Sequence, residues 1–288
     1  MARSPHIVDA FARETFTGNQ VAVVPDADGL ATKTRHRIAL ERNYSEATFI
    51  TLPESIADGY RVRVFTSATE LPFADHPTLG TASVIHRCIS RRASAAVGLD
   101  VVVGSIEVTN GAAEDQDRYW MEQQSPTFGP ANDRARTATI LGLEKDRLDS
   151  HHDPQTVTTG LQALLVPLRS LHAVQAAHLD PEPFRLFVDG FETNAVIVFS
   201  SGTGDERNDL HARMFLNAMD ITQDPATGSS NGCLAGYQVH HDDFGHRSLD
   251  VTVEEGSEID RPSTMDIRAD ASRSEEHTSE LQSPSAIS

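Results

Sequence analysis

Two segments in opposite halves of the chain share one layout, and this duplication constrains the fold more than any other feature. Residues 74–82 and 224–232 each contain a polar residue, then Pro, Thr and Gly, and then small residues that lead into an apolar stretch. Each layout is typical of a turn that opens a helix. We therefore predict a duplicated fold, with the functional site where the two halves meet.

The stretches that follow the two turns predict buried helices. Residues 78–89 are small and apolar on nearly every side of a helix, and residues 229–239 repeat that pattern. A helix without a polar face must be covered all round, which a surrounding sheet can do. The sequence thus predicts two lobes, each with a central helix inside curved strands.

The rest of the chain favours mixed, mainly antiparallel β structure with helices between the strands, so the expected fold class is α+β. Residues 125–130 contain two prolines and a glycine and are expected to break any regular element. Helices are expected at residues 32–43, 134–141 and 181–189. Strands are expected at residues 6–11, 21–24, 47–52, 60–65, 163–168, 194–199, 211–215, 248–253 and 263–268. We place the N-terminal lobe at residues 1–117 and the C-terminal lobe at 118–272.

The last segment has a different character. Residues 273–283 resemble the in-frame translation of a sequencing-library adapter, so residues 273–288 are interpreted as a non-native tail. On that interpretation the C-terminal lobe is truncated and its closing strand is missing. We then expect an unpaired sheet edge near Ile267.

Composition excludes several classes of protein. The formal net charge of −18 argues against a surface for nucleic acid or anionic lipid, because both need clustered Lys and Arg. The longest apolar runs, such as residues 195–199, are too short to cross a membrane, and the N-terminus lacks the order of a signal peptide. The expected location is the cytoplasm.

Cysteine and histidine do not predict a metal site. Cys88 and Cys233 each fall within an expected helix and are interpreted as buried, small apolar residues. The histidine pairs at residues 151–152 and 240–241 lack the spacing and third partner of a zinc site, so they are interpreted as solvated loop residues.

Four motifs in series resemble the phenazine-biosynthesis PhzF-like isomerase family. They lie at residues 8–11 with 17–24, 45–49, 75–80 and 224–229, and the match runs from about residue 5 to about residue 268. No single motif is specific, but the four in this order are. The resemblance implies a diaminopimelate-epimerase-like fold, an isomerase activity and a homodimer. It implies no metal, nicotinamide, flavin or pyridoxal cofactor.

The resemblance also implies roles for individual residues. Glu46 matches the carboxylate that carries the proton, while His76, Asp224 and Ser229 match groups that hold and polarise the substrate. A carboxylate whose pKa is raised by partial burial can both remove and return a proton. The expected catalytic residues are therefore Glu46, His76 and Asp224.

Helix starts supply the expected binding groups. Backbone N–H groups at the start of a helix attract anions, so a small anionic metabolite is the expected partner. We expect it to be bound by Ser229, Gly228, Thr227 and Ser230 from one half and by Thr78, Gly80 and Asn19 from the other. Simple capping of a helix is the alternative role for Ser229.

One departure from the family pattern keeps a second function open. Asp75 stands where family members usually carry Gly, and it adds a negative charge beside His76. A catalytically silent protein that binds small acids is therefore one alternative. A two-base epimerase or racemase is another, but it normally uses cysteines at both helix starts, and Cys88 and Cys233 lie deeper in their expected helices.

Overall fold

The computed structural model divides the chain into two units. Unit 1 consists of Met1–Glu122 with Gln282–Ser288, and unit 2 consists of Gln123–Leu281. The structure describes residues 4–42, 44–51, 59–90, 94–111, 118–180, 182–184, 195–216, 223–245, 248–271, 278–284 and 286–287. Among these residues, no helix is long and apolar enough to cross a membrane.

Unit 1 is a mixed sheet. Its strands are β1 (His6–Ala10), β2 (Asn19–Val24), β3 (Glu46–Thr51), β4 (Tyr60–Phe65), β5 (Glu70–Leu71), β6 (Ala96–Val101), β7 (Gly104–Asn110), β8 (Arg118–Glu122) and β17 (Ala286–Ile287). The pairs β1–β2, β3–β4 and β6–β7 are antiparallel, whereas β2–β3 and β4–β6 are parallel. Helix α1 (Thr32–Arg42) connects the parallel strands β2 and β3.

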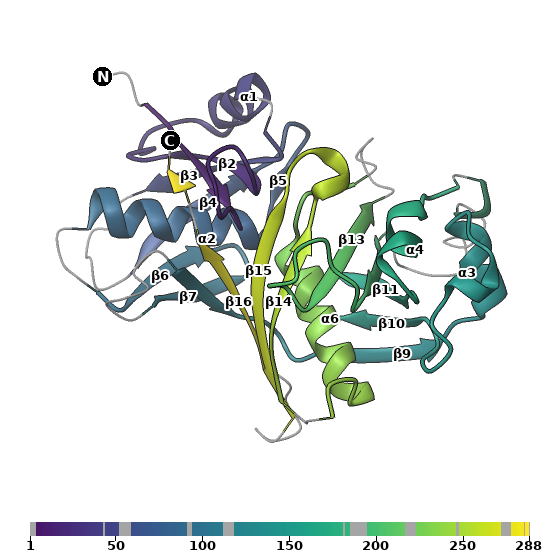
Figure 1. The fold of residues 1–288 in the computed structure, drawn as a ribbon. Helices are drawn as coiled ribbons and strands as arrows, with labels where there is room; N and C mark the ends of the chain where they lie inside the picture. Colours follow the sequence, from purple (N-terminus) through teal and green to yellow (C-terminus); the bar gives the residue numbers. More distant parts are fainter. Residues whose placement is uncertain are drawn as a thin grey trace. The chain divides into compact units, whose positions relative to one another are not determined.

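The central element of unit 1 is helix α2 (Asp75–Val84), which continues into a π-helical turn, η2 (Ile85–Ile89). Every residue of α2 is buried. The helix contacts β1, β2, β3, β6, β7 and β8, and Figure 1 shows it (blue) lying among those strands. The sequence shows no polar face in this helix, and the structure explains why: strands cover the helix on all sides.

Unit 2 repeats this arrangement. Its strands are β9 (Thr127–Ala131), β10 (Gln155–Thr158), β11 (Gln162–Pro167), β12 (Ala195–Ser200), β13 (Leu210–Leu216), β14 (Ser248–Glu255) and β15 (Ser263–Asp270). Strand β16 (Thr278–Pro284) has residues in both units. The pairs β10–β11, β12–β13 and β14–β15 are antiparallel, whereas β11–β12 and β13–β14 are parallel. The shorter helices are α3 (Arg134–Ile140), η3 (Lys145–Arg147), α4 (Leu171–Ala176) and η4 (Ser257–Ile259).

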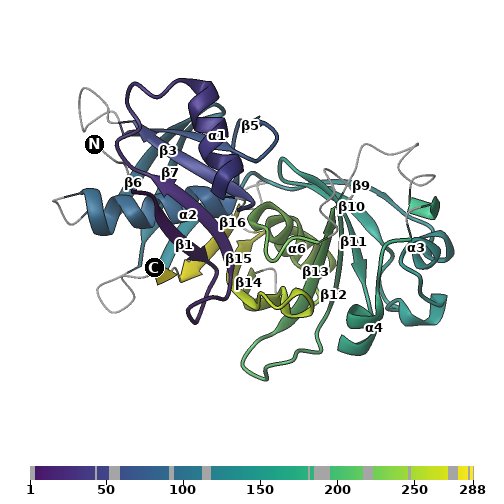
Figure 2. The same cartoon turned by 90° about the horizontal axis from the view of Figure 1, so that it is seen from above.

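Helix α6 (Gly228–His241) is the central element of unit 2. It contacts β10, β11, β14 and β15, and Figure 2 shows it (green) beside those strands. It lies between β13 and β14 in the chain, as α2 lies between β5 and β6. Both units therefore have the same alternation of antiparallel and parallel pairs around a buried helix, and the predicted duplication of an α+β lobe is confirmed.

One local expectation is wrong. Residues 125–130 were expected to break regular structure, but β9 includes Gly129 and Pro130 and pairs with β10. The register shifts between Gln155 and Val157, so Gly129 and Pro130 together face Thr156 in a β-bulge, where a missing N–H is tolerated. The expected edge near Ile267 stays a prediction.

Two further expectations fall largely outside the described residues. Of the helix expected at residues 181–189, only residues 182–184 are described. The expected boundary between the lobes includes residues 112–117, which are not described either.

Close packing of α2 on β2 gives a first testable prediction. A Cβ added at Gly80 would lie 2.7 Å from Cγ1 of the buried Val21. We expect Gly80→Ala to lower the free energy of unfolding by about 1–3 kcal/mol, as overpacked cores do. Urea unfolding measures this. Gly98→Ala is the control, because its Cβ would make only ordinary contacts and should change stability by less than about 0.5 kcal/mol. Equal stability of the two variants would contradict the packing described.

Candidate functional site

Glu46 and His76, two of the predicted catalytic residues, lie together in unit 1. Glu46 is the first residue of β3, and His76 is the second residue of α2. The Nε2 atom of His76 is 3.1 Å from Oε2 of Glu46, and the two side chains are 6% and 16% exposed. The pair is therefore largely removed from water, which strengthens any interaction between its charges.

Asn19 completes this group from a third element. It begins β2, and its Nδ2 atom donates a hydrogen bond of 3.3 Å to Nδ1 of His76. With Nδ1 as the acceptor, the proton of a neutral ring is on Nε2, the nitrogen that lies 3.1 Å from Glu46. We refer to Asn19, Glu46 and His76 as the unit 1 triad.

The local fold explains why these remote residues meet. Strands β2 and β3 are parallel neighbours with Val21 opposite Glu46, so the starts of both strands lie at the same edge. Gly18 precedes Asn19 with a φ of +75°, and a Cβ there would lie 2.2 Å from the carbonyl oxygen of Ala10. Only glycine fits that turn without strain. Helix α2 packs on both strands and brings His76 to them.

The start of α2 differs from the sequence prediction. The helix begins at Asp75, and both N and Oγ1 of Thr78 donate to the carbonyl oxygen of Ala74, at 3.2 and 2.7 Å. Gly80 is in the middle of the helix. The sequence analysis placed Thr78 and Gly80 at the helix start, where backbone N–H groups are free to bind an anion. In the structure both residues lie further along the helix. Asp75 is buried, and its φ is not positive.

The predicted residues of the second half lie in unit 2. Asp224 forms a bridge with Met214 of β13, its N–H donating to the Met214 carbonyl at 3.3 Å. Its Oδ2 atom accepts a hydrogen bond from Oγ1 of Thr227, the N-cap of α6. Both residues are half-buried. The turn that was recognised in the sequence is thus tied to a strand at one end and to a helix at the other.

The other predicted residues of this turn occupy the first turn of α6 rather than preceding it. Gly228 is the first helical residue, and Ser229 and Ser230 follow. Oγ of Ser230 donates to the carbonyl oxygen of Thr227 at 2.7 Å, and the carbonyl of Ser229 accepts from Thr159 at 3.1 Å. The backbone N–H groups of this turn lie at the positive end of a 14-residue helix, which favours an anion.

One buried acid near this turn was not found in the sequence. Glu255 ends β14 with an exposure of 1%, and its Oε1 atom accepts a hydrogen bond of 2.8 Å from Nδ2 of Asn231 in α6. Burial is the main cause that raises the pKa of Glu255 to about 8. The strand expected from the sequence ends at residue 253, but its alternation, continued to residue 255, places Glu255 on the face of Leu249, Val251 and Val253. That phase was the available signal of burial.

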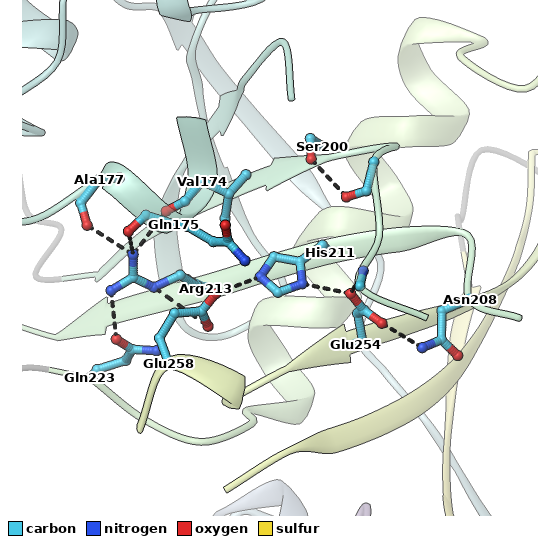
Figure 3. Close-up of polar contacts among 12 residues, drawn as sticks. Val174, Gln175, Ala177, Ser200, Asn208, His211, Arg213, Gln223, Glu254 and Glu258 are labelled. Carbon is cyan, nitrogen blue, oxygen red and sulfur yellow. Dashed lines mark hydrogen bonds and ion pairs between the residues drawn. The ribbon is translucent and has the colours of Figure 1, made fainter. Parts of the chain in front are cut away.

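A second polar group in unit 2, shown in Figure 3, was also missed. We call it the His211 cluster, and it consists of His211, Arg213, Glu254 and Glu258. The ring atoms Nδ1 and Nε2 of His211 lie 2.7 Å from Glu254 and 2.9 Å from Glu258, respectively, and His211 is 1% exposed. Hydrogen bonds to two carboxylates require both ring nitrogens to carry protons.

The His211 cluster connects several chain segments. Glu254 accepts hydrogen bonds from the backbone N–H groups of Gly204 and Asp205 and from Nδ2 of Asn208. Arg213 donates to the carbonyl oxygens of Val174, Gln175 and Ala177 at the end of α4, and to Gln223, the residue before Asp224. Arg213 therefore holds the residue that precedes Asp224.

Cysteine and histidine depart from their predicted settings. Cys233 is buried as expected, whereas Cys88 is exposed in η2. His240 and His241 lie in the last turn of α6, not in a loop. His241 and His152 line a pocket of about 630 Å³ at that end of the helix, together with Asp149 and Asp243. No predicted catalytic or binding residue lines this pocket.

Comparison with known proteins places this geometry in context. The family described as phenazine biosynthesis-like protein matches residues 8–285. A Pseudomonas aeruginosa protein named trans-2,3-dihydro-3-hydroxyanthranilate isomerase is 34% identical over 268 residues, which are 92% of this chain and 89% of that protein.

Solved structures agree with this match. A Bacillus anthracis phenazine biosynthesis protein of the PhzF family has a TM-score of 0.88 and 25% identity, covering 100% of this chain and 97% of that one. A probable proline racemase from Agrobacterium radiobacter has a TM-score of 0.63 and 9% identity, with coverage of 100% and 92%. The second likeness concerns the fold alone, and both confirm the predicted diaminopimelate-epimerase-like class.

Proposed function

Because this chain belongs to the phenazine biosynthesis-like protein family and is an isomerase, we propose that it moves a proton on a small carboxylate-bearing metabolite without a cofactor. The observation that carries the proposal is the contact of 3.1 Å between Glu46 and His76 in a largely buried setting. A lone carboxylate beside a proton donor can perform a proton shift, because such a reaction needs neither a redox group nor a nucleophile.

The proposed steps use the unit 1 triad. The Glu46 carboxylate removes a proton from a carbon of the substrate, a double bond shifts, and the same carboxyl group returns the proton to another carbon. One C–H bond breaks and one forms, so the reaction is balanced without a further reactant. His76, whose Nε2 atom lies 3.1 Å from Glu46, holds the carboxylate in position, and Asn19 fixes the ring and its tautomer.

The roles of Asp224 and of the first turn of α6 remain predictions from the sequence. We propose that the N–H groups of this turn bind the carboxylate of the substrate and that Asp224 binds a polar group. The name of the Pseudomonas relative describes a hydroxylated dihydro-anthranilate, which carries a carboxylate. We therefore propose trans-2,3-dihydro-3-hydroxyanthranilate or a similar cyclic amino acid as substrate, and a homodimer as the working form.

The test is an assay of the wild-type protein with this compound in D2O. When the proton on the Glu46 carboxyl group exchanges with solvent before it is returned, deuterium enters the product, which mass spectrometry and NMR detect; NMR also detects the isomerised product itself. Isothermal titration with the same compound is run in parallel. Binding without turnover or deuterium incorporation would support the silent binding protein for which Asp75 is the sequence hint, and would contradict the proposed isomerisation.

The two-cysteine epimerase receives no support from the described residues. Cys233 is buried within α6, with its Sγ atom 3.6 Å from the carbonyl oxygen of Val157 and 3.5 Å from that of Leu161. Cys88 is in η2, after the end of α2. Neither thiol is at a helix start, where a substrate carbon would be positioned between two such bases.

A further inference from the structure

Glu255 is hydrogen-bonded to the first turns of α6, next to residues 224–227, which we call the Asp224 turn. Its Oε1 atom accepts a hydrogen bond from Nδ2 of Asn231, and that amide also donates to the carbonyl oxygen of Thr227 at 3.0 Å. Glu255 thus contacts Asn231, and this amide links it to Thr227, the N-cap of the helix.

The next residue supports the same turn. Gly256 has a φ of +75°, and a Cβ added there would lie 2.7 Å from the carbonyl oxygen of Pro225. Asp224 is joined to Thr227 by the hydrogen bond between their side chains. Residue 256 therefore packs against the turn from Asp224 to Thr227, and the side chain of Glu255 is linked to the same turn through Asn231.

The surroundings of Glu255 favour its uncharged form. Burial raises its pKa, and the negative charge of Asp224 raises it further. The hydrogen bond from Asn231, the positive charge of His211 on β13 and the N–H of Thr227 lower it, and the resulting pKa is about 8. His211 is itself held by Glu254 and Glu258. Among the described residues, Oε2 of Glu255 is buried without a hydrogen-bond partner, a costly state for a carboxylate.

We propose that Glu255 is a positioning residue of the isomerase, and that it holds the Asp224 turn against the start of α6 only while it is protonated. This inference rests on the proposed function, because it requires Asp224 to serve the reaction. When Glu255 loses its proton, a second negative charge is buried beside Asp224. The turn then shifts and anion binding at the helix start weakens, so activity is lost in alkaline solution.

The test compares the dependence of kcat on pH in the wild type and in Glu255→Gln, with trans-2,3-dihydro-3-hydroxyanthranilate as the probe. Gln is an uncharged isostere of the protonated acid. For a single group with a pKa of about 8, kcat of the wild type should fall about tenfold between roughly pH 7 and roughly pH 9. Glu255→Gln should retain activity near pH 7 and change by less than about twofold over that range.

The matched control is Asp250→Asn, which removes an exposed carboxylate from the same strand. It should show the same fall in kcat as the wild type. An alkaline fall that is unchanged in Glu255→Gln would overturn the proposal. Loss of activity of Glu255→Gln at every pH, with the fold intact by circular dichroism, would also overturn it.

A second measurement separates this inference from the proposed function. Protein labelled with ¹³C at the Glu carboxyl carbons is titrated by NMR, and the Glu255 signal is the one missing from Glu255→Gln. A midpoint near 8 is expected, and a midpoint below about 6 would overturn the inference whether or not the protein turns over the probe. If the midpoint is near 8 but the wild type shows no exchange, the proposed function fails instead.

Discussion

Glu46→Gln is expected to lower kcat for solvent deuterium incorporation by about a thousandfold, within the range of about 10² to 10⁴ for the loss of a general acid or base. Gln keeps the shape of Glu46 and can still contact Nε2 of His76, 3.1 Å from the carboxylate in the native protein. It cannot accept and return a proton. The fold should therefore be retained, and the loss should appear in kcat rather than in the binding of substrate.

The control for this variant is Glu107→Gln, which removes an exposed carboxylate from β7 of the same unit. Its kcat should match that of the wild type. Mass spectrometry measures deuterium incorporation and isothermal titration measures the affinity for substrate, both on the same protein preparations. If Glu46→Gln exchanges deuterium at the rate of the Glu107→Gln control, Glu46 is not the group that carries the proton.

The elements at the centre of each unit could be predicted from the sequence because their burial is local information. A run of small, apolar residues without a polar face predicts a covered helix, and α2 and α6 are such helices. Their starts were less well placed. The Pro77 ring occupies the third position of α2, where no N–H is needed, so the helix could begin three residues before the predicted Thr78.

The contact between Glu46 and His76 depended on long-range structure. The two residues are 30 positions apart, and nothing in their local pattern distinguishes them from other polar residues. The motifs that resemble the isomerase family pointed to both. The parallel pairing of β2 with β3, and the packing of α2 on both, then explain why they meet.

The burial of several polar residues in unit 2 could not be predicted from the sequence around them. His211 and Glu254 lie on the faces of their strands that alternation assigns to solvent, whereas Glu255 shares a face with Leu249, Val251 and Val253 and is a polar residue on an apolar face. They are buried because partners from distant segments satisfy them: Glu258 for His211, residues 204–208 for Glu254, and Asn231 for Glu255. Such pairing is a property of the folded chain and leaves no periodic signal in the sequence.

His211→Leu is expected to lower the free energy of unfolding by about 3–5 kcal/mol near neutral pH, the cost of leaving a buried ionic group without its partner. The leucine fills similar space but leaves Glu254 and Glu258 facing each other without the imidazolium that lies 2.7 and 2.9 Å from them. Urea unfolding, followed by circular dichroism, measures the change. His172→Leu, an exposed histidine in α4, is the control and should change stability by less than about 0.5 kcal/mol.

The dependence of this effect on pH distinguishes charge pairing from simple packing. Burial lowers the pKa of His211, but the hydrogen bonds to Glu258 and Glu254 outweigh it, so the pKa lies above its ordinary 6.5. The contribution of His211 to the free energy of unfolding is thus present below pH 6.5 and is lost as the pH rises through the raised pKa. Burial raises the pKa values of Glu254 and Glu258, but their hydrogen bonds bring both below the ordinary 4.5. Their contribution is present above pH 4.5 and is lost as the pH falls through the lowered values.

The stabilisation by the His211 cluster should therefore be largest between these two limits and should decline on both sides. We expect the difference in unfolding free energy between wild type and His211→Leu to be largest between about pH 4.5 and about pH 6.5, and to shrink both toward about pH 3 and as the pH rises above about 6.5. A difference that stays constant over this range would mean that the imidazole acts by filling space alone.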